Sequence, residues 1–175
     1  DFLEQLKVPI YKIASFEITD LPLISKVAST GKPMIISTGM ATLSEIEDAV
    51  RTARSSGCDQ ITLLKCTSNY PADPSNSNLK TIPNIKEVFK CEVGLSDHTL
   101  GIGVAIGAIS LGANIIEKHF TISRKDGGVD SAFSMEPNEM KLLVDESLKA
   151  WRSIGKITFG PSKSEKKSMI NLDIK

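Results

Sequence analysis

The two histidines of the chain, His98 and His119, are its clearest candidates for chemistry. Each follows a short apolar run that is typical of a β-strand, Glu92 to Leu95 and Asn114 to Lys118. The small-residue segment between them, roughly Leu100 to Leu111, is typical of a helix. A strand–helix–strand unit makes its strands parallel, so both imidazoles are expected at one edge of the sheet. Neutral imidazoles are good ligands for Mn²⁺, Fe²⁺ or Zn²⁺, and two of them leave positions open to water and substrate. The alternative is that each histidine is hydrogen-bonded at the edge of a loop.

Other apolar runs of the chain also end in polar side chains. Lysines and hydroxyls gathered at one edge of a sheet suit a phosphate or a carboxylate, because they offer charge-assisted hydrogen bonds. The alternative is that they are simply solvated strand ends. These residues are Lys12, Ser15, Ser37, Thr38, Lys65, Thr67, Ser96 and Lys118.

Two carboxylates have open roles. Glu17 is a candidate general acid or base, or it caps the next helix. Asp130, in the sequence DGGVDSAF, is a candidate for binding substrate hydroxyls, or it organises a turn.

The elements that must position these side chains form five strand–helix units. The strands end near Ser15, Ser37, Lys65, Ser96 and Lys118. An open doubly wound α/β sheet and a (β/α)₈ barrel both fit this order. The barrel is favoured because its active face is built from polar residues at the carboxyl ends of the strands. A complete barrel needs about 250 residues, so we expect a partial TIM barrel of about the last five units, with three strands missing before Asp1.

Composition limits the class of protein. Lys+Arg and Asp+Glu both number 21, so the net charge of +0 gives no reason to expect a nucleic-acid partner. The uncharged run Thr99 to Ile116 changes from a helix to a strand pattern, which favours a buried crossover over a membrane span. The three cysteines have no CxxC or zinc-like spacing, so we expect reduced thiols and a cytoplasmic location.

Five motifs, in this order, closely resemble the sialic acid (nonulosonic acid) synthase family. They are YKIASFE, IISTGMAT, LLKCTSNYP, GLSDHT and EKHFT, and the resemblance runs from Tyr11 to about Gly160. SFEITDLPLI and SRKDGGVDSAFSMEP look most like the pseudaminic acid synthase branch. The resemblance implies condensation of phosphoenolpyruvate with an open-chain N-acetylated amino sugar, 2,4-diacetamido-2,4,6-trideoxy-L-altrose, which gives pseudaminic acid and phosphate.

The resemblance also implies roles for individual residues. His98 and His119 would hold a divalent metal, Mn²⁺ or Mg²⁺, and count with Glu17 as catalytic. Ser68 stands where an asparagine ligand of phosphoenolpyruvate is often found, which makes its role less secure. The implied substrate-binding residues are Lys12, Ser15, Ser37, Ser68, Tyr70, Ser96 and Asp130.

The resemblance further implies the division of the chain. Residues 1–158 would be the C-terminal part of the barrel, and residues 159–175 a linker towards a missing antifreeze-like domain. The whole protein would be a domain-swapped homodimer. We expect the 175-residue chain alone to be inactive. Two alternatives stay open: a legionaminic or N-acetylneuraminic acid synthase, and a non-catalytic metal- or sugar-binding barrel fragment.

Overall fold

The computed structural model describes residues 2–170 and contains one parallel sheet of five strands in the order β1-β2-β3-β4-β5. Each strand pairs in parallel with the next one along the chain. This sheet confirms the five predicted strand–helix units. The strands are β1 (Tyr11–Ile13), β2 (Met34–Ser37), β3 (Ile61–Cys66), β4 (Glu92–Asp97) and β5 (Ile115–Lys118).

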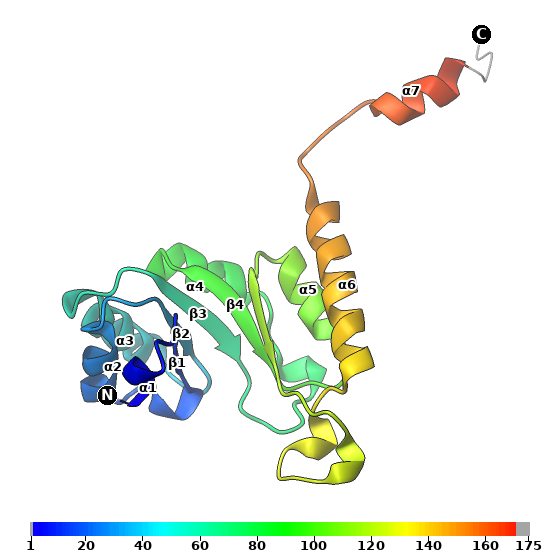
Figure 1. Cartoon of the computed structure of the whole chain (residues 1–175). Helices are drawn as coiled ribbons and strands as arrows, with labels where there is room; N and C mark the ends of the chain where they lie inside the picture. Colours follow the sequence, from blue (N-terminus) through cyan, green and yellow to red (C-terminus); the bar gives the residue numbers. More distant parts are fainter. Residues whose placement is uncertain (1, 171–175) are drawn as a thin grey trace.

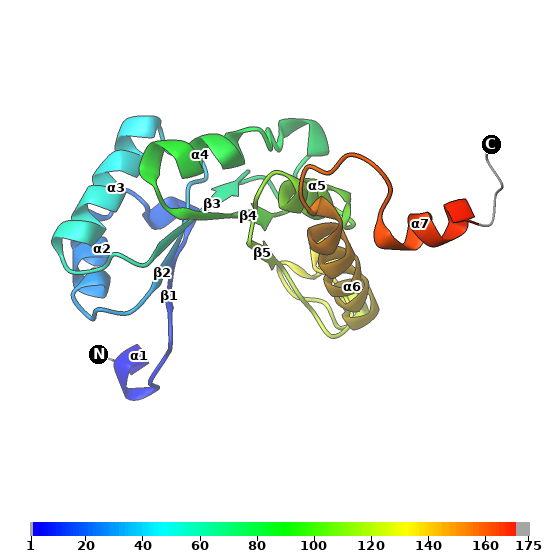
Figure 2. The ribbon, with the colours of Figure 1, turned by 90° about the horizontal axis from the view of Figure 1, so that it is seen from above.

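The helices from α2 (Leu21–Ala28) to α6 (Pro137–Ile154) lie along the convex side of this curved sheet, which leaves its concave side open (Figures 1 and 2). The arrangement is that of half a barrel. The helices are α1 (Phe2–Gln5), α2 (Leu21–Ala28), α3 (Leu43–Ser55), α4 (Thr81–Phe89), α5 (Gly103–Ser110), α6 (Pro137–Ile154) and α7 (Lys163–Ile170), with short 3₁₀ turns at Ser15–Glu17, Pro74–Asn76, Arg124–Asp126 and Ser131–Phe133.

Alternation along the strands separates an apolar layer from a polar one. Successive strand residues point to opposite faces. Ile13, Ile36, Leu63 and Val93 belong to the buried cluster beneath the helices. The alternate positions, which include Lys12, face the concave side. The apolar layer therefore fixes the sheet, and the concave side is free to carry polar side chains at its carboxyl edge.

Two helices begin with side-chain caps. Asp20 accepts a hydrogen bond from the Leu23 backbone N–H at the start of α2. Thr42 and Glu45 form a reciprocal capping box at the start of α3. Such caps satisfy N–H groups that the first turn of a helix leaves unpaired.

Other boundaries differ from the prediction. α5 begins at Gly103 rather than near Leu100, because Gly101 has a φ of +73° in the turn that precedes it. The predicted linker contains α7, which extends away from the sheet in Figure 1, and residues 171–175 of that linker lie outside the described residues. Within residues 2–170, no helix has both the length and the apolar character needed to cross a bilayer.

Candidate functional site

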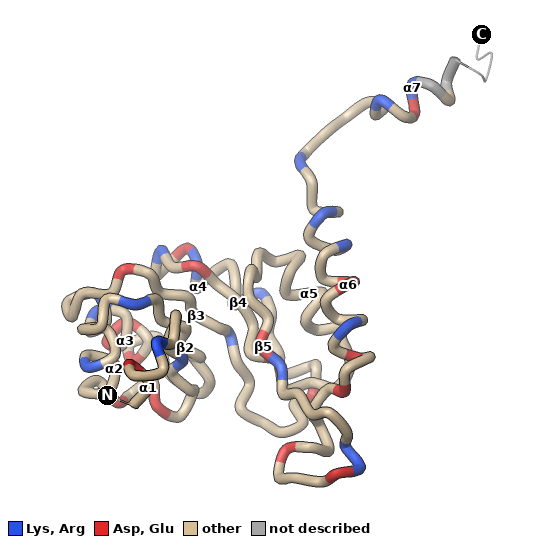
Figure 3. The backbone as a smooth tube through the Cα atoms, in the orientation of Figure 1, with Lys and Arg blue, Asp and Glu red and all other residues tan. Residues whose placement is uncertain are grey.

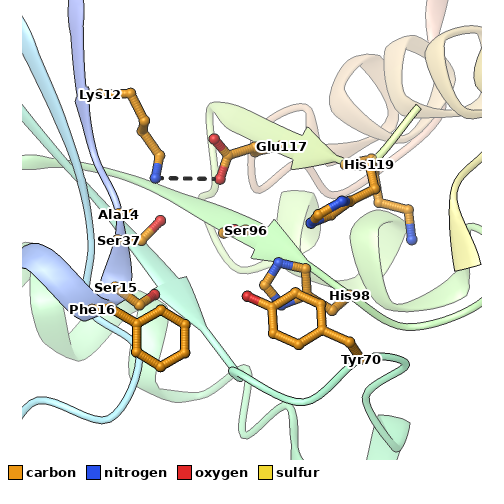
Figure 4. A pocket seen from close by; sticks show the side chains of 11 residues that line it. Lys12, Ala14, Ser15, Phe16, Ser37, Tyr70, Ser96, His98, Glu117 and His119 are labelled. Atoms are coloured by element: carbon orange, nitrogen blue, oxygen red, sulfur yellow. Dashed lines mark ion pairs between the residues drawn. The ribbon is translucent and has the colours of Figure 1, made fainter. Parts of the chain in front are cut away.

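A cavity of about 440 Å³ lies at the carboxyl ends of the strands (Figure 4), and we call it the rim cavity. It is the edge where the polar strand ends were expected to meet. Eight of the candidate residues line it: Lys12, Ser15, Ser37, Tyr70, Ser96, His98, Lys118 and His119.

His98 and His119 converge on the rim cavity as predicted, with ring centroids 5.2 Å apart. His98 Nδ1 lies 2.8 Å from the Thr67 carbonyl oxygen, to which it can only donate. His119 Nδ1 lies 3.5 Å from the Asp130 carboxylate. A histidine whose Nδ1–H is engaged in this way keeps the lone pair of Nε2 available.

These contacts fit a divalent metal. Metal-binding histidines usually donate their second ring N–H to a carbonyl or a carboxylate. His98 has such a hydrogen bond, and His119 has a carboxylate 3.5 Å from Nδ1. Within residues 2–170, no group of three or more His, Cys, Asp or Glu side chains is arranged to hold a metal. The two imidazoles would therefore leave most positions on the metal to water and substrate.

A buried ion pair lies directly behind the two histidines. Lys118 Nζ is 3.1 Å from Asp97 Oδ2 and also donates to the Thr99 carbonyl. The two charged side chains are only 3% and 1% exposed. Because Asp97 and Lys118 each precede a histidine by one residue, the pair ties together the strand ends that carry both imidazoles.

The opposite wall of the rim cavity suits an anion. Lys12 Nζ lies 3.6 Å from Glu117 Oε2, and Figure 4 shows the two side chains facing each other. The buried Ser37 hydroxyl is the only such side-chain N or O atom in the described part of the chain without a hydrogen-bond partner. An orphaned buried hydroxyl that lines a cavity is placed to bind a ligand oxygen.

The other two strand-end lysines are not free for an anion. Lys65 donates to the Cys66 carbonyl and to the Thr67 hydroxyl, and it does not line the rim cavity. It lies on the same side of β3 as Leu63, beneath the helices, because strand side chains alternate. Lys118 is committed to Asp97. Lys12 also has partners, the Ile13 carbonyl at 3.1 Å and the Glu117 carboxylate, but it lines the rim cavity and its pair with Glu117 is partly exposed. Of the three lysines expected to bind an anion, the geometry therefore favours Lys12.

A thiol lies beside His98. Ser15 Oγ donates to Cys66 Sγ at 3.1 Å, and His98 Nδ1 is 4.0 Å from the same sulfur. Burial acts to raise the pKa of Cys66, but hydrogen bonds from His98 and Ser15, together with the imidazole charge, bring the pKa down to about 7. Burial acts to lower the pKa of His98, but the Cys66 and Thr67 contacts raise it on balance. The raised pKa of His98 favours its protonated form, so a metal at Nε2 would have to displace a proton.

Aromatic rings surround the histidines. The Tyr70 ring lies 4.2 Å from the His98 ring, measured between centroids, and Phe133 lies 5.1 Å from His119 and 5.5 Å from Tyr70. Burial, followed by the nearby negative charges, raises the pKa of Tyr70, so its hydroxyl stays a donor near neutral pH. The cluster covers the histidine side of the rim cavity with a ring surface and one hydroxyl.

Three predicted residues lie outside the lining. Glu17 is exposed and accepts a hydrogen bond from the Ala14 backbone N–H at 2.8 Å, so it caps its own 3₁₀ turn. It does not cap the next helix as the alternative expected, because Asp20 is the cap of α2. Ser68 lies behind Cys66, with 3.8 Å between hydroxyl and sulfur. Asp130 reaches the site through His119. The substrate and catalytic roles of all three stay predictions.

Phe16, Glu117 and Phe133 belong to the site but were given no role from the sequence. Glu117 lines the rim cavity, and its spacing of two residues from His119 on one strand was the available indication. Phe133 joins the ring cluster from a loop, where no periodic pattern predicts the direction of a side chain.

Comparison with known sequences identifies related proteins. The profile of the NeuB family matches residues 1–158. A pseudaminic acid synthase of Helicobacter pylori is 48% identical over 145 residues, which are 83% of this chain and 43% of that protein. An N,N'-diacetyllegionaminic acid synthase of Campylobacter jejuni is 43% identical over 171 residues, 97% of this chain and 51% of that protein. The chain spans about half the length of these curated relatives.

Solved structures show the same fold. An N-acetylneuraminic acid synthetase of Leptospira borgpetersenii, solved with citrate, superposes with a TM-score of 0.87 at 35% identity, over 98% of this chain and 60% of that one. A 3-deoxy-D-arabino-heptulosonate 7-phosphate synthase of Thermotoga maritima, at 21% identity, has a TM-score of 0.72 and shares the fold. The predicted partial α/β barrel is confirmed.

Proposed function

Because this chain belongs to the NeuB family, whose members include sialic and nonulosonic acid synthases, we propose that it forms the substrate-binding half of a phosphoenolpyruvate-dependent synthase. The whole protein would join phosphoenolpyruvate to an open-chain N-acetylated amino sugar. The observation that carries this proposal is the rim cavity, where an anion-binding wall faces a pair of imidazoles.

Phosphoenolpyruvate would occupy the Lys12 side. The ammonium of Lys12 and the hydroxyls of Ser15, Ser37 and Ser96 would bind its phosphate and carboxylate through charge-assisted hydrogen bonds. Ser37 supports this assignment best, because its buried hydroxyl has no partner within the protein.

The sugar would occupy the histidine side. A divalent cation held by His98 and His119, Mn²⁺ or Mg²⁺, would supply Lewis-acid polarisation of the sugar aldehyde. The Thr67 carbonyl lies at Nδ1 of His98, and the Asp130 carboxylate lies near Nδ1 of His119. These contacts would orient the two rings. Tyr70, a donor on this side, would bind a sugar hydroxyl while its ring excludes water.

Positioning does much of the work in such a condensation, because both substrates must lie in near-attack geometry. C3 of phosphoenolpyruvate attacks the aldehyde carbon, which forms the new C–C bond and leaves a cationic C2. Water adds to C2, and the C–O bond to phosphate then breaks. Glu117 is the carboxylate that lines the rim cavity, so we propose it as the group that accepts the proton of the water. Glu17 is the alternative.

The proposed sugar is 2,4-diacetamido-2,4,6-trideoxy-L-altrose, and the product is pseudaminic acid. The 48% identity to the Helicobacter pylori synthase and the motif SRKDGGVDSAFSMEP favour it. The second candidate is a legionaminic acid synthase, which is favoured by a match over 97% of the chain.

The decisive experiment incubates the whole protein with phosphoenolpyruvate, Mn²⁺ and each candidate sugar in turn. We expect phosphate release together with the mass of pseudaminic acid. The mass of legionaminic acid alone would select the second candidate, and absence of release with every sugar would refute the synthase function.

The metal assignment has its own test, which needs no turnover. Titration of Mn²⁺ into the chain, followed by the paramagnetic resonance of free Mn²⁺, should show one site that the variant His98→Ala/His119→Ala lacks. Unchanged Mn²⁺ affinity in this variant would refute the assignment. Metal binding in a whole protein that never turns over would instead favour a non-catalytic barrel.

A further inference from the structure

Residues 120–135 form a loop that leaves β5 after His119 and returns to the start of α6. Its base is closed by backbone hydrogen bonds, from the Met135 N–H to the His119 carbonyl and from the Thr121 N–H to the Met135 carbonyl, both 2.9 Å. Asp130 and Phe133, the two loop residues that contact His119, lie on its returning half. Figure 3 shows acidic and basic residues together on this loop and at the start of α6.

Arg124 connects this loop to α6. Its guanidinium donates to both carboxylate oxygens of Glu139, at 2.6 and 3.0 Å, and to the Ser134 carbonyl at 2.9 Å. Its backbone N–H donates to Glu136 at 2.9 Å. A bidentate arginine–carboxylate pair fixes its geometry better than a single hydrogen bond does. Arg124 thus links the two halves of the loop to the first turn of α6.

From Arg124 a chain of contacts leads to the histidine. Ser134, which Arg124 binds, donates its hydroxyl to the Asp130 carbonyl at 2.8 Å. The Asp130 carboxylate lies 3.5 Å from His119 Nδ1. Gly127 and Gly128, both with positive φ values, lie between Arg124 and the exposed Asp130. Turn hydrogen bonds, such as that from the Ser131 N–H to the Gly128 carbonyl at 3.3 Å, also hold this part of the backbone.

We propose that Arg124 is a positioning residue for the sugar half of the site, acting through Asp130. It touches neither wall of the rim cavity and leaves the Lys12 side untouched. This inference rests on the proposed function. It predicts a defect confined to one of two substrates, because only the sugar side depends on the loop.

The test measures steady-state kinetics of the whole protein with both substrates. Arg124→Gln should raise the KM for the amino sugar about tenfold, which corresponds to about 1.4 kcal/mol of binding free energy, while the KM for phosphoenolpyruvate changes less than twofold. Arg51→Gln is the matched control, because Arg51 pairs with Asp48 on the outer surface of α3, and it should change neither constant.

A double variant separates positioning from a general loss of structure. If Arg124 acts through Asp130, adding Arg124→Gln to Asp130→Ala should raise the sugar KM less than twofold further. Should Arg124→Gln fail to fold, Glu139→Gln removes the carboxylate charge and should raise the same KM by a smaller factor.

The two hypotheses fail differently. Absence of sugar-dependent phosphate release in the unmodified protein refutes the synthase function and this inference with it. Normal release with an unchanged sugar KM in Arg124→Gln, an equal rise in both KM values, or full additivity with Asp130→Ala refutes the inference alone.

Discussion

The buried pair of Lys118 and Asp97 allows a sharp test of how the site is held. Lys118→Met keeps most of the side-chain volume and removes the ammonium. It leaves the Asp97 carboxylate in a place where its side chain is 1% exposed, with only the Thr99 backbone N–H and hydroxyl as donors. Removing one partner of a buried ion pair costs about 3–5 kcal/mol, because the other charge stays buried without compensation.

Urea unfolding of the chain, followed by circular dichroism, measures this loss. With a slope of about 2 kcal/mol per molar urea, the midpoint should fall by about 2 M. Lys149→Met is the matched control, since Lys149 forms an exposed pair with Glu146 and its side chain is 70% exposed. That control should change the free energy of unfolding by no more than about 1 kcal/mol.

A second variant identifies the cause of the loss. Asp97→Asn/Lys118→Met has no buried charge, so it should be more stable than Lys118→Met even though it carries one more substitution. A loss below about 1 kcal/mol in Lys118→Met, or a double variant less stable than the single one, would show that the pair does not hold the two strand ends together.

Three further predictions concern single positions. Ser37→Ala should raise the KM for phosphoenolpyruvate in the whole protein while leaving the free energy of unfolding within about 0.5 kcal/mol, because the lost hydroxyl has no partner in the protein; a large loss of stability would contradict this. Gly94→Ala would place a methyl group 2.3 Å from the Ile115 carbonyl oxygen of β5. Thermal unfolding should therefore show that the free energy of unfolding falls by about 3 kcal/mol or more. The control Gly103→Ala, where a methyl group meets no atom within 4 Å, should leave this free energy unchanged or raise it. In metal-free buffer, thiolate absorbance at 240 nm should rise as the pH rises through about 7, as Cys66 loses its proton; His98→Ala should move this step to higher pH, and an unchanged step would contradict the assignment.

Much of the fold could be predicted from the sequence, because apolar runs at regular spacing determine parallel strands and their crossover helices. The same pattern placed His98 and His119 at one edge, and the structure brings their rings to 5.2 Å. The edge at which Ser37 lies was predictable, because the carboxyl ends of parallel strands meet at one edge of the sheet.

The rest depends on which face of a strand a residue occupies and on contacts between loops. Lys65 belongs to a polar strand end, but alternation turns it away from the rim cavity. The carbonyl that orients His98 belongs to the backbone of Thr67. A contact to the backbone cannot be predicted from the residue type. Arg124 and Glu139 meet across a loop whose path is set by tertiary contacts.

Asp97 and Lys118 pair on the helix side of the sheet, and His98 and His119, the next residues, line the rim cavity. This alternation also limits how the protein can evolve. Deleting or inserting one residue in β4 or β5 would exchange the two faces. The histidines would then enter the apolar layer, and the charged pair would enter the cavity. Length changes in these strands should therefore be eliminated by selection, whereas the loop at 120–135 can change its length and composition between enzymes while the histidines stay in place.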